Sequence, residues 1–125
     1  MLTHARWLFG LAALFNLSVV LGLLLLGPWL NPLLQLNEAT GSNLALRDLG
    51  LMLIATFGFA YLCVAHSPTK FRLYIPLGVM GKSLVVIAIY GHWLAGHISW
   101  QLPALALGDV LFAWLFLSFL RRYPA

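Results

Sequence analysis

Two charged residues stand inside long apolar stretches of this sequence. Lys82 is the one charged residue within residues 73–94, and Asp109 is the one charged residue within residues 102–120. A charge in apolar surroundings is costly unless an opposite charge and hydrogen bonds compensate it. We therefore expect the two side chains to meet. Such a pair is suited either to fastening helices together or to binding a ligand, an ion or a proton.

The apolar stretches that carry these residues are long enough to cross a membrane. Only 8% of the 125 residues are charged and 62% are hydrophobic, whereas a typical soluble domain has about 25% charged residues. This composition excludes a water-soluble domain and a disordered chain. At 1.5 Å per residue, about 20 apolar residues in a helix span a hydrocarbon core of about 30 Å. We predict an all-α, single-domain integral membrane bundle over residues 1–125, with four transmembrane helices at about 7–26, 44–65, 73–94 and 102–120.

Each predicted helix places one polar side chain near the same depth. For each helix, the distance along the axis is counted from a polar or basic residue at the end that faces the same side of the membrane. By this count, the four polar side chains lie about 15 to 18 Å into the membrane. The polar residues are Asn16, Thr56, Lys82 and Asp109, counted from Arg6, His66, Arg72 and Arg121. We predict that they form one polar cluster inside the bundle. An internal clasp that fixes helix register and a ligand or ion site remain alternatives.

The basic residues indicate how the chain is threaded. They lie before the first helix, between the second and third, and after the fourth, as Arg6, Lys70, Arg72, Arg121 and Arg122. The positive-inside bias then puts both termini in the cytoplasm of a multi-pass protein of the plasma membrane. The same bias places Trp29, Trp93 and Trp100 at the outer interface and Trp7 at the inner one.

The outer segments hold the remaining candidate residues. Residues 28–42 are too short to span the membrane, and their leucines predict a short interfacial helix, after which Ser42 is the expected N-cap of the second long helix. If that helix starts near Asn43, its first two turns bring Arg47 and Asp48 to the outer headgroups. The outer-face candidates are Arg47, Asp48, His92 and His97.

The sequence contains no recognisable metal, cofactor or catalytic signature. His92 and His97 are five residues apart, which departs from the spacing of four that puts two ligands on one helix face. The lone Cys63 excludes an intramolecular disulfide and a cysteine-cluster metal site. The seven basic residues are scattered, and this distribution argues against nucleic acid as a partner. We therefore predict no metal site, no cofactor and no catalytic residue.

The layout resembles that of the DoxX-like group of small bacterial four-helix membrane proteins. The shared features are a retained first helix, the outer-loop prolines Pro28 and Pro32, and the stretch Leu46-Arg47-Asp48-Leu49-Gly50 at the entry to the second helix. The resemblance implies the four-helix fold and, together with the small size of the chain, the inner membrane of a bacterium as its location. It transfers no redox or quinone role to a residue here, because the basic residue typical of the late first-helix region is absent.

Three classes of function fit these features. The first is a non-catalytic helper or subunit of a membrane assembly, favoured by the short predicted loops. The second is a small transporter or lipophilic-ligand-binding bundle that uses the Lys82 and Asp109 cluster. The third is a membrane-embedded redox or lipid enzyme. The expected partners are the lipid bilayer and either a second copy or a larger membrane complex.

Overall fold

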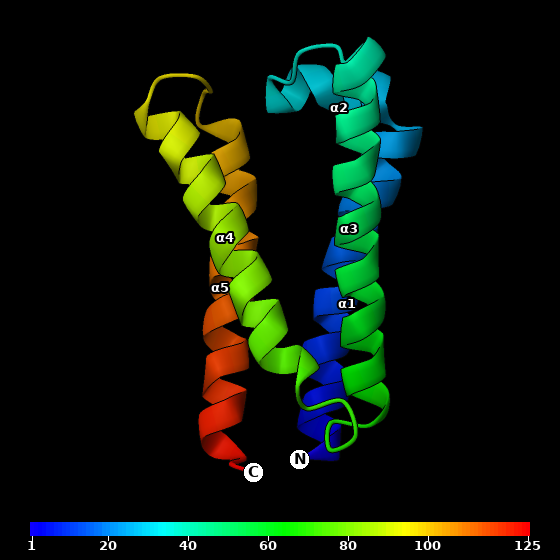
Figure 1. Ribbon diagram of the computed structural model, residues 1–125, viewed down its shortest axis with the longest axis vertical. Helices are drawn as coiled ribbons and strands as arrows, with labels where there is room; N and C mark the ends of the chain where they lie inside the picture. Colours follow the sequence, from blue (N-terminus) through cyan, green and yellow to red (C-terminus); the bar gives the residue numbers. More distant parts are fainter.

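The computed structural model describes residues 1–125 and consists of five α-helices without strands (Figure 1). The helices are α1 (Leu2–Leu25), α2 (Gly27–Leu34), α3 (Gly41–His66), α4 (Tyr74–Leu94) and α5 (Gln101–Arg122). All except α2 are long and apolar enough to cross a membrane, as predicted. The predicted all-helical bundle with four candidate spans is confirmed.

The short α2 and the start of α3 refine the predicted boundaries. A proline in its first turn starts α2, where a missing N–H costs nothing, and this helix is the one expected in the outer segment. Helix α3 begins at Gly41, so Arg47 and Asp48 lie in its second turn. The expectation that Ser42 is the N-cap is wrong. Thr40 occupies that position with extended backbone angles, and no side chain caps the helix.

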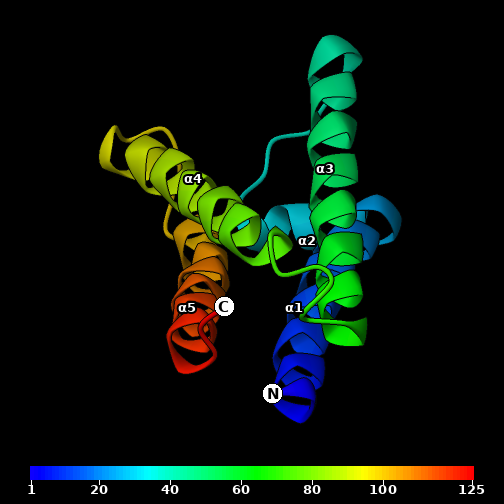
Figure 2. The ribbon, with the colours of Figure 1, turned by 60° about the horizontal axis from the view of Figure 1, so that its bottom comes forward.

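The four long helices form two hairpin-like pairs. Helix α1 packs along α3, and α4 packs along α5. The two pairs meet near the end of the bundle that carries both termini and diverge toward the other end (Figures 1 and 2). We call these the termini end and the α2 end. The connection between α3 and α4 is at the termini end, whereas α2 and residues 95–100 lie at the α2 end (Figure 1).

The buried core fills the half of the bundle nearest the termini. Phe9 of α1 stacks on Phe116 of α5 with ring centroids 4.6 Å apart, and it meets the edge of Phe119 at 5.3 Å. Small residues of α1 let these rings approach. The core consists of Ala5, Leu8, Phe9, Ala12, Ala13, Tyr61, Val64, Ile75, Phe116 and Phe119. Close packing at this end joins the two pairs while their other ends stay apart.

Glycines at the junction between the pairs receive aromatic rings. A Cβ on Gly78 would lie 2.8 Å from the ring of Tyr61, and one on Gly108 would lie 2.7 Å from the ring of Phe15. A Cβ on Gly81 would lie 3.1 Å from the ring of Phe57. The glycines of α4 and α5 therefore seat rings carried by α1 and α3.

Candidate functional site

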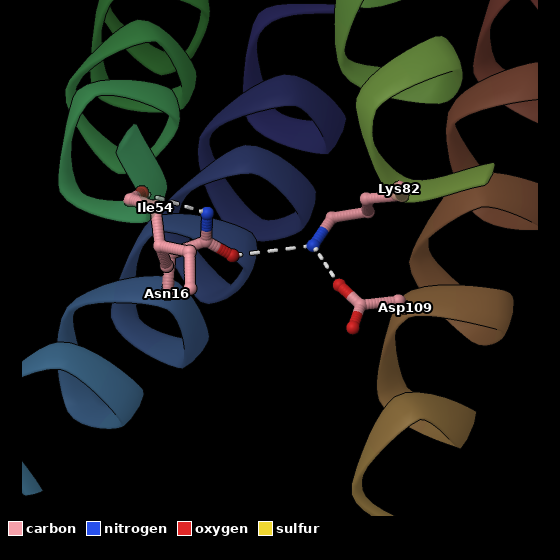
Figure 3. Close-up of polar contacts among 4 residues, drawn as sticks. All are labelled: Asn16, Ile54, Lys82 and Asp109. Carbon is pink, nitrogen blue, oxygen red and sulfur yellow. Dashed lines mark hydrogen bonds and ion pairs between the residues drawn. The ribbon is translucent and has the colours of Figure 1, made fainter. Parts of the chain in front are cut away.

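Lys82 and Asp109 pair at the centre of the bundle. The ammonium group of Lys82 on α4 donates a 2.8 Å hydrogen bond to Oδ1 of Asp109 on α5. It donates a second, of 3.2 Å, to Oδ1 of Asn16 on α1 (Figure 3). Lys82 is only 3% exposed. The predicted meeting of Lys82, Asp109 and Asn16 is thus observed in the structure.

The same network reaches α3, the remaining long helix, through a backbone carbonyl group. The amide nitrogen of Asn16 donates a 3.1 Å hydrogen bond to the carbonyl oxygen of Ile54 on α3 (Figure 3). An unbroken chain of hydrogen bonds therefore runs from α3 through α1 and α4 to α5. Buried polar groups are costly unless they are hydrogen-bonded, so this chain stabilises the contact of all four helices.

Thr56 does not join this cluster, although its depth along α3 predicted that it would. Its side chain is exposed, and its hydroxyl donates a 2.9 Å hydrogen bond to the carbonyl oxygen of Met52, one turn earlier in α3. Depth fixes the height of a residue on a helix but not its direction. Thr56 follows Ile54 by two residues, or about 200° of rotation, and so lies on the opposite face.

Three aromatic rings complete the surroundings of the Lys82 ammonium group. Its nitrogen lies 5.3 Å from the ring centroid of Phe15, 5.4 Å from that of Tyr61 and 5.5 Å from that of Phe112. Ring faces attract cations at such distances, most strongly where water is excluded. The sequence carried a signal for this arrangement, since Phe15 precedes Asn16 and Phe112 follows Asp109 by one helical turn.

A half-enclosed cleft of about 470 Å³ lies between the two helix pairs. Its lining comes from all four long helices and is mostly apolar. Along α4 the lining runs from Gly81 to Ile89, about 12 Å toward the α2 end. The lining residues include Asn16, Leu53, Tyr61, Lys82, Val85 and Asp109. The polar cluster therefore lies at the closed end of the cleft, directly above the packed core.

Helix α2 covers one side of the space between the pairs. A second hollow, of about 300 Å³, lies between α1, α2 and α5, and is lined by Leu30 and Leu34 of α2. It shares lining residues with the main cleft, among them Phe15 and Leu105. On the other side, α3 and α4 diverge toward the α2 end (Figures 1 and 2). Helix α2 therefore covers the cleft on the side of α1 and α5.

The outer-face candidates form two separate pairs away from this cluster. Arg47 and Asp48 make a 2.8 Å ion pair on α3. The Nδ1 atoms of His92 and His97 lie 2.8 Å apart at the end of α4 and in the loop that follows. No group of three or more histidine, cysteine, aspartate or glutamate residues comes together in positions that suit a metal ion.

Only one of the two carboxylate oxygens of Asp109 accepts a hydrogen bond within the protein. Its Oδ1 accepts the bond from Lys82, whereas Oδ2 has no hydrogen-bond partner in the protein. This oxygen is not sealed off, and the side chain keeps 17% of its surface exposed.

Comparisons of the chain with family models, with curated proteins and with solved structures found no match. The geometry of the cleft and its polar end therefore carries the functional argument.

Proposed function

We propose that this protein binds a lipophilic molecule of the membrane in the cleft between its two helix pairs. One observation carries the proposal: an apolar cleft of about 470 Å³, lined by all four spans, ends at a buried ion pair. Small-molecule sites are typically clefts of about 300 to 1,000 Å³ with mostly apolar walls and a few placed polar groups. The cleft has this character.

The route into the cleft follows from the arrangement of the helices. Helix α2 covers the α1 and α5 side, while α3 and α4 diverge toward the α2 end (Figure 2). In a bilayer, diverging helices face acyl chains and not water. A lipophilic ligand therefore enters sideways from the bilayer, with its tail toward the α2 end and its head at Lys82 and Asp109.

A purely structural clasp explains less of the geometry. Protein interiors are close-packed, so helices fastened only for stability would be expected to close around the clasp. Here the packing is tight on the termini side of Lys82, but it opens into a cleft on the α2 side. We place binding ahead of transport and of redox or lipid chemistry, because binding needs only the cleft and its paired polar end.

A helper or subunit of a membrane assembly is the second candidate. The segments that join the helices are short, at residues 35–40, 67–73 and 95–100, so most of the chain lies in the four spans. Large apolar side chains on their outer faces, such as Trp114 and Phe59, are exposed. These faces suit lipid or the helices of a partner, and a partner complex is compatible with a ligand in the cleft.

Two tryptophan substitutions on α4 test the proposed binding. Val85 lines the cleft, whereas its neighbour Leu84 points outward and is 58% exposed. Native mass spectrometry of protein released from membranes in mild detergent should show a lipophilic adduct on the wild type and on Leu84→Trp. Val85→Trp fills the cleft and should lose the adduct. Absence of any adduct on the wild type, or equal adducts on both variants, would contradict the proposal.

We further propose that both termini face the cytoplasm, in the inner membrane of a bacterium. The support is that five of the seven basic residues lie in the sequence segments found at the termini end, whereas Trp29, Trp93 and Trp100 belong to the segments at the α2 end. Kinship with the DoxX-like group belongs to this same proposal. It rests on the four-span layout and on the outer-loop prolines Pro28 and Pro32.

A further inference from the structure

We infer that the ligand of this cleft carries an uncharged head group with a hydroxyl, as in a long-chain alcohol or a partial glyceride, and that this hydroxyl donates to Oδ2 of Asp109. The inference rests on the proposed function, because it names the class of molecule that the same cleft would take. It depends on which hydrogen-bonding positions at the closed end are already occupied.

The open position at the closed end is an acceptor. A carboxylate only accepts hydrogen bonds, and its two oxygens offer about four positions. Lys82 occupies Oδ1 of Asp109, while Oδ2 has no partner in the protein and is not sealed off. An unpaired anionic oxygen at membrane depth is costly, so a donor from outside the protein stabilises it. A hydroxyl in the cleft is such a donor.

The donors of Lys82 and Asn16 are already used or shielded, whereas the hydroxyl of Tyr61 is free both to donate and to accept. Two N–H groups of Lys82 are hydrogen-bonded, and its side chain is 4% exposed and surrounded by rings. Asn16 donates to Ile54 and accepts from Lys82. Tyr61 lines the cleft and its hydroxyl makes no hydrogen bond in the protein. A head group that both donates and accepts, as a hydroxyl does, matches this set better than a donor-only ammonium.

Charge balance selects an uncharged head group. The ion pair of Lys82 and Asp109 carries no net charge. A carboxylate or phosphate head would place a second negative charge beside the open oxygen of Asp109. An ammonium head would leave a net positive charge beside Lys82. Either arrangement leaves an uncompensated charge near the bilayer midplane, whereas a neutral hydroxyl leaves none.

Four probes with the same chain length test the head group. The full protein in phosphatidylcholine nanodiscs is titrated with hexadecan-1-ol, hexadecyl methyl ether, palmitate and hexadecylamine, and the bound fraction is read by native mass spectrometry. The alcohol should bind about tenfold more tightly than the ether, which cannot donate, because a hydrogen bond to a charged group is lost. Palmitate and hexadecylamine should both bind more weakly than the alcohol.

Variants separate failure of this inference from failure of the proposed function. Lys82→Met with Asp109→Leu removes both charges together, and it should abolish the preference for alcohol over ether. Val85→Trp should lose all four probes, and Leu84→Trp should keep them. If no probe binds the wild type, the cleft is not a lipophile site. If the ether binds as tightly as the alcohol, or a charged probe binds more tightly, the site stands and the hydroxyl inference is overturned.

Discussion

The side-chain nitrogen of Lys82 lies 3.2 Å from the amide oxygen of Asn16, and this contact joins the two helix pairs at the centre of the bundle. The other side-chain hydrogen bond between the pairs is at the termini end, where Nδ1 of His4 lies 3.4 Å from the hydroxyl of Tyr123. Toward the α2 end the pairs diverge. Lys82 and Asn16 thus mark the boundary between the packed core and the cleft.

Removing Lys82 alone should destabilise the protein strongly. Lys82→Met leaves Asp109 as an uncompensated buried charge, and breaking a buried pair in this way costs about 3 to 5 kcal/mol. The double variant with Asp109→Leu should recover most of that loss, because no lone charge remains. Thermal unfolding in dodecyl maltoside measures the stability of the single and the double variant. A single variant as stable as the double variant would show that the pair is not buried together.

Asn16 and Thr56 should respond very differently to loss of their polar groups. Asn16→Leu removes the bonds to Lys82 and Ile54, which should cost about 1 to 3 kcal/mol. Thr56→Val should change stability by less than about 0.5 kcal/mol, since the exposed hydroxyl bonds only to its own helix. The same unfolding assay compares the stability of the two variants. Equal losses for the two variants would place Thr56 in the cluster.

Two glycines of α4 test the seating of aromatic rings. Gly78→Ala forces its Cβ against the Tyr61 ring and should destabilise the protein by about 1 to 3 kcal/mol. Gly91→Ala is the matched control, because nothing lies within 4 Å of its added Cβ. It should leave stability unchanged or raise it by up to about 1 kcal/mol. Similar effects at both positions would argue against the contact of α3 with α4 at Gly78.

Single cysteines should report the orientation of the chain. With Cys63→Ala as background, Thr69→Cys lies in the α3–α4 connection and Ser99→Cys lies in the α4–α5 connection, both at exposed positions. In intact cells, a membrane-impermeant maleimide should label Ser99→Cys at once. It should label Thr69→Cys only after the membrane is permeabilised. The reverse pattern would place the termini outside.

The sequence was sufficient to predict the spans and most of the polar cluster. Hydrophobic runs predicted four helices, and the cost of a lone charge in lipid predicted that Lys82 and Asp109 meet. The depth of Asn16 along its helix predicted that it joins the cluster. Depth gives no direction around a helix, however, and for that reason the same prediction is wrong for Thr56.

The cleft was beyond what the sequence predicts. Apolar residues such as Val85 and Leu84 have the same character whether they face lipid, a core or a cleft, so composition cannot separate these surfaces. Glycines such as Gly78 and Gly81 allow a neighbour to approach a membrane helix closely, but a glycine does not specify which group approaches. The structure shows that it is a ring in both cases, from Tyr61 and Phe57. The opening between the pairs depends on such contacts between distant segments.

The most direct test of the account is whether a folded protein without the central charges still holds its ligand. Lys82→Met with Asp109→Leu removes the polar end of the cleft but leaves its apolar walls in place. Native mass spectrometry should then show a folded protein, with unfolding close to that of the wild type, whose lipophilic adduct is weakened about tenfold, because the apolar walls remain but the hydrogen bond to Asp109 is lost. A folded double variant that retains the adduct at the wild-type level would contradict a binding role for Lys82 and Asp109.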